Sequence, residues 1–217
     1  MSDQPDWAEE TEGRLLTAAL DHADTLGWTR RLVAAAARDV GLTLAEAELL
    51  LPEGPRDLAA LLARRDDAAA LAAMAATDPA ALKIRERIRT GVVARIKAAM
   101  EHEAATLRWM GFLALPTNAP LGLRLLWASA DALWRWAGDT ATDENHYSKR
   151  ALLAEILAST LAIRLTSDAD AAERHLDRRI EAVMAFERCK GRLKPGEAAV
   201  RAARTLGRLR YGGGLRT

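Results

Sequence analysis

The chain has 217 residues, of which 50% are hydrophobic and 28% are charged, and its formal net charge at pH 7 is +1. This is the composition of a soluble globular protein that is long enough to bury a sizeable core. The near-neutral balance gives no overall attraction to nucleic acid or to another acidic partner, so any electrostatic recognition must be local. Cys189 is the only cysteine, which excludes an intrachain disulfide and disfavours a cysteine-based metal site.

The N-terminal segment 1–12 is acidic and polar, which predicts neither a secretory signal peptide nor an arginine-rich transit peptide. No apolar run reaches the roughly 20 residues that a membrane-spanning helix needs. We therefore expect a soluble, cytoplasmic protein.

Alanine, leucine, arginine and glutamate dominate the chain and no strand-like alternation appears, so the sequence predicts an all-α fold. Glycines, prolines and capping residues divide it into segments. In chain order we expect helices over about 11–26, 29–40, 43–51, 56–76, 79–100, 107–115, 121–137, 143–166, 170–189 and 195–211. Thr43 and Glu46 form a capping box for the third helix, and Asp78 followed by Pro79 is expected to open the fifth. The predicted domains are 1–55, 56–190 and 191–217.

The first three expected helices are separated by Gly27 and Gly41 and have the order of a helix-turn-helix unit. Their spacing resembles the N-terminal domain of the tetracycline-repressor (TetR) family. The expected recognition helix carries Glu46 and Glu48 and has no Lys, Arg, Gln or Asn, although base readout and phosphate neutralisation both need hydrogen-bond donors there. We therefore predict a vestigial helix-turn-helix that serves as a scaffold, and no binding of nucleic acid.

No pattern typical of catalysis or of metal binding emerges. His22, His102, His146 and His175 are scattered and form no His-x-x-x-His or Glu-x-x-His pair. The sequence contains neither a phosphate-cradling glycine loop nor a nucleophile elbow. We predict no cofactor and no metal, and a binding protein rather than an enzyme.

Tryptophan accounts for six of the few aromatic residues. Trp127 and Trp134 lie a heptad apart on one face of the expected seventh helix. This face either packs in the core or forms the wall of a cavity for a long apolar ligand. The candidate lipid-binding residues are Trp109, Leu123, Trp127, Ala130 and Trp134.

The last expected helix is basic, because residues 198–217 contain five arginines and no acidic residue. Arginines and aliphatic side chains fall on opposite arcs of a helical wheel, a pattern that suits an anionic membrane surface. The alternative is a helix docked on its own bundle with solvated arginines. The candidate membrane-contacting residues are Arg201, Arg204, Leu206, Arg208 and Leu209.

The most informative stretch is 134–150, which leaves one helix, turns at Gly138 and enters the next helix through a dense cluster of polar and aromatic residues. A short connection needs only a glycine and a capping residue, so the surplus polar chemistry indicates a recognition surface. Residues 136–153 resemble the ubiquinone (coenzyme Q) biosynthesis accessory family, whose mitochondrial members are lipid-binding proteins with a TetR-like fold. The matching residues are Gly138, Asp139, Thr142, Asp143, Asn145, Tyr147, Ser148, Lys149 and Arg150. His146 departs from the pattern, because the family commonly has Trp before the tyrosine.

The resemblance implies a TetR-like, non-catalytic accessory protein that binds an isoprenoid lipid or quinone precursor at the inner face of the membrane. It also implies presentation of that lipid to a di-iron quinone hydroxylase, and a homodimer formed through the eighth and ninth helices. The candidate partner-docking residues are Trp136, Asp143, Asn145, His146, Tyr147, Lys149 and Arg150. Local capping explains only Asp143 and Asn145 in this set. Two alternatives remain, namely a ligand-responsive transcription regulator of the TetR type and, less favoured, a di-iron enzyme.

Overall fold

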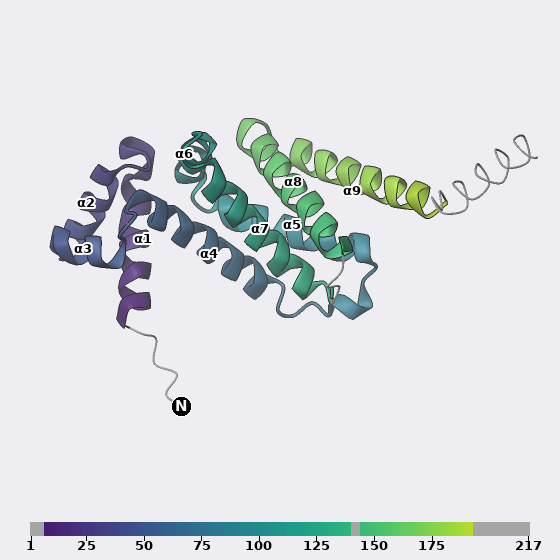
Figure 1. The fold of residues 1–217 in the computed structure, drawn as a ribbon, viewed down its shortest axis with the longest axis horizontal. Coiled ribbons are helices and arrows are strands. Elements are labelled where there is room, and N and C mark those ends of the chain that lie inside the picture. Colours follow the sequence, from purple (N-terminus) through teal and green to yellow (C-terminus); the bar gives the residue numbers. More distant parts are fainter. Residues whose placement is uncertain (1–6, 140–143, 193–217) are drawn as a thin grey trace, which may run out of the picture. The chain divides into compact units, whose positions relative to one another are not determined.

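A computed structural model describes residues 7–139 and 144–192, and every regular element in these two ranges is a helix (Figure 1). The α-helices are α1 (Trp7–Leu26), α2 (Arg30–Asp39), α3 (Leu44–Leu50), α4 (Pro55–Ala73), α5 (Ile84–Met100), α6 (Glu103–Ala114), α7 (Ala119–Trp136), α8 (Glu144–Thr166) and α9 (Ala169–Arg192). A single 3-10 turn, η1 (Pro79–Ala81), precedes α5. The predicted all-α fold is confirmed. The expected last helix, 195–211, lies outside the described residues.

The chain divides into two compact units at Leu176. The first contains α1 to α8 and the beginning of α9, and the second is described only for residues 177–192, which continue α9. The domain boundaries expected after residues 55 and 190 stay predictions.

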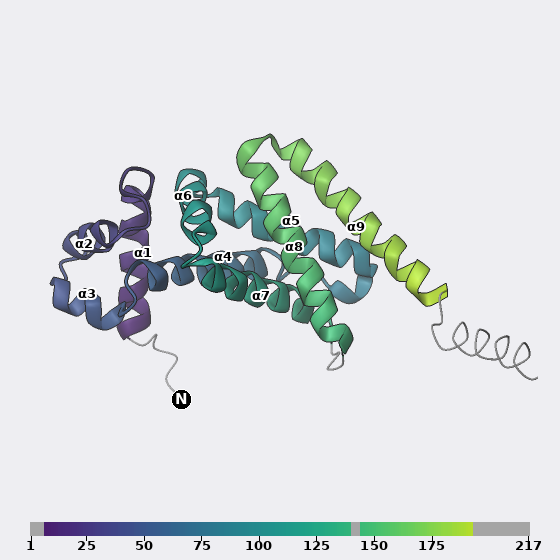
Figure 2. The same cartoon turned by 45° about the horizontal axis from the view of Figure 1, so that its top comes forward.

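Within the first unit, α1, α2 and α3 lie together in both views (Figures 1 and 2). Gly27 and Gly41 have φ angles of 60° and 77°, in the left-handed region where glycine has no Cβ penalty, and they end α1 and the α2 turn as expected. The Thr43–Glu46 capping box is present, with the Thr43 backbone N–H donating to Glu46 Oε2 at 2.8 Å. Trp28 joins this group to the bundle, because its buried indole N–H donates to the Ala105 carbonyl at 3.1 Å.

The predicted start of the fifth helix is wrong. The Asp78 side chain accepts the Ala80 backbone N–H at 2.9 Å, so it caps only η1. The backbone then becomes extended at Leu82 and Lys83. A second local cap, in which Glu86 accepts the Lys83 backbone N–H at 2.9 Å, starts α5 at Ile84 instead.

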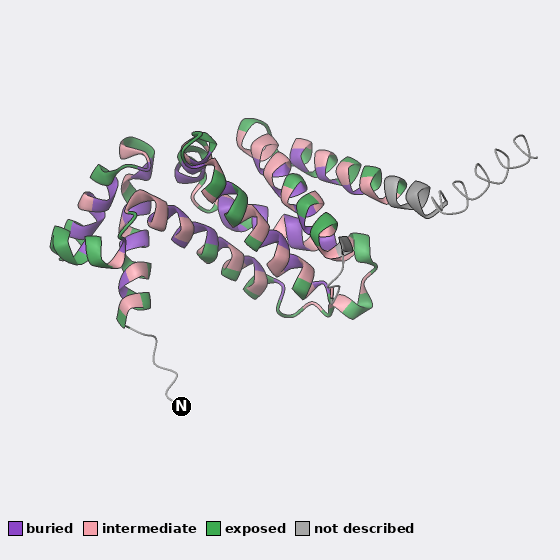
Figure 3. Ribbon diagram, viewed as in Figure 1, coloured by how far each residue is buried: buried purple, intermediate pink, exposed green. Residues whose placement is uncertain are grey.

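The core of the first unit lies between α4, α5, α7 and α8, which pack on one another along their buried faces (Figure 3). Leu58, Leu62, Val92 and Leu153 are among the most buried side chains. α5 and α7 approach closely at Gly91, where a Cβ atom would lie 3.2 Å from Leu133 Cδ2. This packing fixes α7 and α8 as a hairpin, and it is this hairpin that carries most of the residues predicted to have a function.

Candidate functional site

The connection between α7 and α8 is held by the ends of both helices. Gly138, with a φ angle of 85°, reverses the chain after the C-terminus of α7. The Trp134 indole N–H donates to the Lys149 carbonyl at 3.0 Å, which ties the last turn of α7 to the first turns of α8. The sequence therefore folds this stretch back on itself, and the segment 140–143 lies outside the described residues.

Four charged residues form what we call the hairpin ion cluster: Asp131, Asp139, Lys149 and Arg150. The Arg150 side chain is only 3% exposed and contacts Asp131 Oδ1 through Nε at 2.6 Å and Asp139 Oδ2 through Nη1 at 3.1 Å. Lys149 Nζ contacts the other oxygen of Asp139 at 2.6 Å and lies 5.3 Å from the centre of the Trp134 ring. Two cations and two carboxylates are thus in direct contact near the connection between α7 and α8.

The pKa of Asp139 reflects this arrangement. Burial alone would raise the pKa of this carboxyl, but hydrogen bonds and positive charge from Lys149 and Arg150 outweigh it and lower the pKa below its usual value. Asp139 is therefore ionised at neutral pH, and the cluster works as a clamp between the two helices.

The structure separates the predicted docking residues into two groups. Lys149 and Arg150 turn into the clamp, and Trp136 and His146 are half-buried. Tyr147 is 64% exposed. Asp143 and the side chain of Asn145 lie outside the part that the structure describes.

Tyr147 belongs to an apolar surface, which we call the aromatic face and define by Leu123, Trp127 and Tyr147. The Trp127 and Tyr147 rings are 6.1 Å apart between centroids. Leu123 lies one turn before Trp127 on α7 and is 69% exposed. Trp127 is half-buried, whereas Leu123 and Tyr147 are exposed, and exposed large apolar side chains mark a surface available to a partner.

The candidate lipid-binding residues do not gather around one space. Trp109 is buried and donates its indole N–H to the Ala59 carbonyl at 3.0 Å, and it borders a cavity of about 20 Å³. A cavity of this size holds about one water molecule. Ala130 is fully buried, whereas Trp134 is half-buried. Lipid binding by this set of residues stays a prediction.

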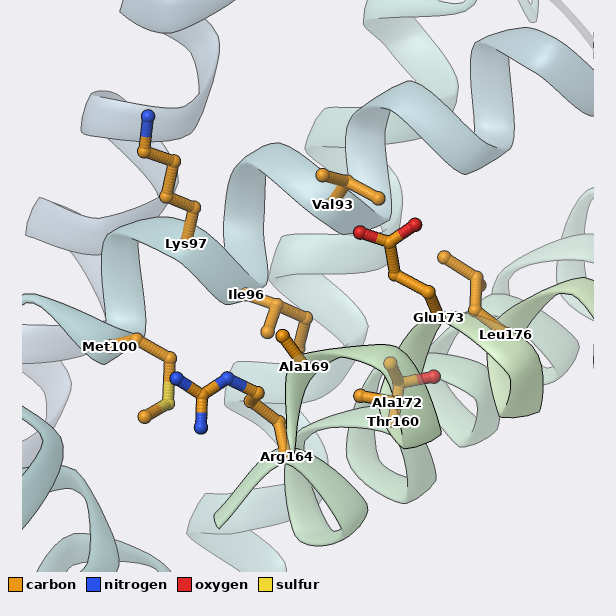
Figure 4. A pocket seen from close by; sticks show the side chains of 10 residues that line it. All are labelled: Val93, Ile96, Lys97, Met100, Thr160, Arg164, Ala169, Ala172, Glu173 and Leu176. Carbon is orange, nitrogen blue, oxygen red and sulfur yellow. The ribbon is translucent and has the colours of Figure 1, made fainter. Parts of the chain in front are cut away.

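A larger cavity lies between α5, α8 and the first turns of α9, which we call the α5–α8–α9 cavity (Figure 4). Its volume is about 250 Å³. The lining residues are Val93, Ile96, Lys97, Met100, Thr160, Arg164, Ala169, Ala172, Glu173 and Leu176. This cavity was not predicted from the sequence, although its α5 residues follow the i, i+3, i+4, i+7 spacing of one helix face. Single helices do not reveal that two further helices leave a space between them.

A second buried charge group, missed by the sequence analysis, lies between α4, α5 and α7. We call it the core ion cluster and define it by Asp66, Asp67, Arg95 and Ser129. Arg95 Nε contacts Asp67 Oδ1 at 2.6 Å and Arg95 Nη1 contacts Asp66 Oδ2 at 3.1 Å. The Ser129 hydroxyl donates to Asp67 Oδ1 at 2.7 Å. Burial raises the pKa of Asp66 to about 6, although Arg95 acts in the opposite direction.

The described residues are 7–139 and 144–192. Within them, no group of three or more His, Cys, Asp or Glu side chains is placed to hold a metal ion. In the same ranges, no helix is both long and apolar enough to cross a membrane. The candidate membrane-contacting residues of 201–209 lie beyond these ranges.

Comparison with known proteins gives a consistent family. Residues 119–187 match the COQ9 family model. The chain is 30% identical over 204 residues to "Ubiquinone biosynthesis protein COQ9, mitochondrial" of Bos taurus, 29% over 204 residues to that of Rattus norvegicus and 28% over 204 residues to that of Homo sapiens. The chain belongs to the COQ9 family. Each alignment covers 88% of this chain and 63%, 65% and 64% of the respective relative, so the chain spans less than two thirds of their length. The region that matches the COQ9 family model includes α7 and α8, and with them the hairpin ion cluster and the aromatic face.

Proposed function

We propose that this COQ9-family protein is a non-catalytic accessory factor of ubiquinone biosynthesis. In this proposal it binds an isoprenoid lipid or quinone precursor, associates peripherally with the inner face of the membrane, and docks a di-iron quinone hydroxylase. Family membership supports the pathway, since the relatives named above are ubiquinone biosynthesis proteins. The observation that carries the docking role is the aromatic face.

The aromatic face suits a protein partner because exposed aromatic side chains commonly anchor interfaces. Its residues come from two helices, and the hairpin ion cluster holds those helices together beneath the surface. Leu123 and Trp127 therefore extend the predicted docking surface, whereas Lys149 and Arg150 support it from inside. Tyr147 belongs to both the predicted and the revised surface.

Lipid binding has separate support in the apolar lining of the α5–α8–α9 cavity. Ligand pockets for drug-sized molecules usually measure about 300–1,000 Å³, so a cavity of about 250 Å³ accommodates a single hydrocarbon chain of a lipid. Membrane attachment through Arg201, Arg204 and Arg208 remains a prediction from the sequence, as do the TetR-like arrangement and the homodimer.

The alternative function, a ligand-responsive transcription regulator, finds little support in α3. Its exposed side chains include Leu44, Glu46, Glu48 and Leu49, and none of its residues is basic. Glu46 also has a lowered pKa, caused by hydrogen bonds from Thr43, so it carries a negative charge at neutral pH. Carboxylates on a recognition helix repel the phosphate backbone.

The docking proposal is tested by alanine substitution of exposed residues. We expect Tyr147→Ala and Leu123→Ala each to reduce co-purification of a co-expressed di-iron quinone hydroxylase by at least about tenfold, the loss typical of an interface anchor. Circular dichroism and lipid content by mass spectrometry should stay unchanged. Leu49→Ala is the matched control, because Leu49 is 81% exposed on α3. Equal co-purification of all three variants and the unmodified protein would place the docking surface elsewhere.

A further inference from the structure

We propose that the α5–α8–α9 cavity binds a single-chain amphiphile with an anionic headgroup, of the fatty-acid class. The proposal rests on the lipid-binding part of the proposed function and specifies what kind of lipid this cavity selects. Three features carry it, namely an apolar lining, a buried hydroxyl group and an arginine, the last two having no hydrogen-bond partner and no counter-ion, respectively, within residues 7–139 and 144–192.

The apolar lining comes from three helices. α5 contributes Val93, Ile96 and Met100, and α9 contributes Ala172 and Leu176. Figure 4 shows these side chains facing a shared space from opposite sides. Such a lining gains free energy by covering a hydrocarbon chain, whereas a polar solute would lose its hydration there.

Thr160 supplies the first polar group. Thr160 is only 2% exposed, and its Oγ1 atom has no hydrogen-bond partner among the described residues. Buried polar groups nearly always have a partner, so an unpaired hydroxyl group that lines a cavity indicates that the partner belongs to a ligand. A ligand oxygen would accept the Thr160 hydroxyl proton.

Arg164 supplies the charge. It lies four residues after Thr160, so both side chains share one face of α8. It is half-buried and forms no ion pair with another described residue. In Figure 4 its guanidinium group is directed toward the Met100 end of the cavity, whereas Glu173 lies toward the Val93 end. Arg89 neutralises Glu173 through a contact of 2.7 Å, which leaves the cation of Arg164 for an external anion.

The volume restricts the ligand further. About 250 Å³ is below the usual size of a drug-sized pocket. One hydrocarbon chain fits such a space better than the two chains of a phospholipid. A planar guanidinium group binds a carboxylate with two parallel hydrogen bonds, which favours a fatty acid over an alcohol of the same length.

The test is isothermal titration calorimetry of the full chain with three probes of equal chain length. Each probe is used at concentrations too low for micelles to form. The probes are decanoate, 1-decanol and decyltrimethylammonium. We expect decanoate to bind at least about tenfold more tightly than 1-decanol, because charge-assisted hydrogen bonds are about twice as strong as neutral ones, and the cationic probe to bind most weakly. Equal affinities for decanoate and 1-decanol would overturn the headgroup assignment while leaving the cavity as an apolar lipid site.

Substitutions locate the binding. Arg164→Gln should weaken decanoate binding about tenfold and leave 1-decanol unchanged, whereas Arg174→Gln, an exposed α9 residue outside the cavity lining, should change neither. Thr160→Val, which keeps the shape and removes the hydroxyl group, should weaken decanoate binding severalfold. Ala172→Phe should abolish binding of both probes by filling the cavity. If decanoate binds Ala172→Phe or Arg164→Gln as it binds the unmodified chain, the inference is wrong. That result would not affect the docking role tested with Tyr147→Ala.

Discussion

The two ion clusters of the first unit contain similar residues and behave in opposite ways. In the core ion cluster, Arg95 serves both Asp66 and Asp67, and the pKa of Asp66 rises to about 6. In the hairpin ion cluster, Lys149 and Arg150 both contact Asp139, and its pKa falls below the usual value.

Solvent-accessible area does not explain this difference. The side chains of Asp66 and Asp139 are 5% and 6% exposed. Asp66 is buried and shares the Arg95 guanidinium group with Asp67, and desolvation outweighs the positive charge of Arg95 and Arg65. Asp139 lies in the connection between two helices and is contacted by two cations, Lys149 and Arg150, of which Arg150 also contacts Asp131. The two aspartates thus differ in which influence is larger, since desolvation prevails at Asp66 whereas hydrogen bonds and positive charge prevail at Asp139.

The largest effect should come from removing the single cation of the core ion cluster. Arg95→Met removes the guanidinium group that contacts the buried Asp66 and the half-buried Asp67, and we expect a loss of about 3–5 kcal/mol in the free energy of unfolding. Urea denaturation at pH 7.5 measures it. Arg64→Met is the control, because Arg64 forms an exposed pair with Glu12 and its side chain is 67% exposed, so its loss should be below about 1 kcal/mol. Similar losses in the two variants would contradict the assignment of the core ion cluster as a buried charge site.

Removing one of the two cations in the hairpin ion cluster should cost less. In Arg150→Met, Lys149 still neutralises Asp139, and Arg135 still contacts Asp131 at 2.7 Å. We expect a loss of about 2–3 kcal/mol, below the range for an uncompensated buried ion. Hydrogen exchange should show faster opening of the first turns of α8, and unchanged exchange there would mean that the cluster does not hold the hairpin.

These clusters also show where sequence analysis reached its limit. The helical class, the Gly27 and Gly41 turns and the Thr43 capping box depend on neighbouring residues, and all were predicted correctly. Asp66 and Asp67 follow two arginines and have the appearance of an ordinary solvated charge run. Only the packing of α4 against α5 brings Arg95 to them, and no local pattern encodes that contact.

In the candidate site, too, local features follow from the sequence, whereas the burial of individual side chains depends on contacts between helices. The sequence predicts a region of unusual chemistry at the α7–α8 connection, but a list of residue types does not say which side chains turn inward. Lys149 and Arg150 are charged and were assigned to the surface, whereas Leu123 is apolar and was assigned to a cavity wall. In the structure Leu123 is exposed and Arg150 is buried. The burial of the Arg150 guanidinium group is offset by its ion pairs to Asp131 and Asp139.

The smallest effect, and the sharpest test of the comparison, is the pH dependence of two asparagine variants. The pKa of Asp66 is raised in the folded state from its usual 3.8 to about 6, so its contribution to stability is complete below about pH 4 and is lost as pH rises through about 6. Asp66→Asn should therefore be more stable than the unmodified chain by about 1 kcal/mol at pH 7.5, and this advantage should shrink at pH 4.5.

Asp139 should behave in the opposite sense. Its lowered pKa means that its stabilising contribution is present above the usual value and disappears only as pH falls below it. Asp139→Asn should thus be less stable than the unmodified chain by about 1 kcal/mol at both pH 7.5 and pH 4.5, since pH 4.5 is still above the pKa in either state. Denaturation at the two pH values compares the variants directly. If both differences change in the same direction between pH 7.5 and 4.5, the two clusters do not differ in the way that their opposite pKa shifts require.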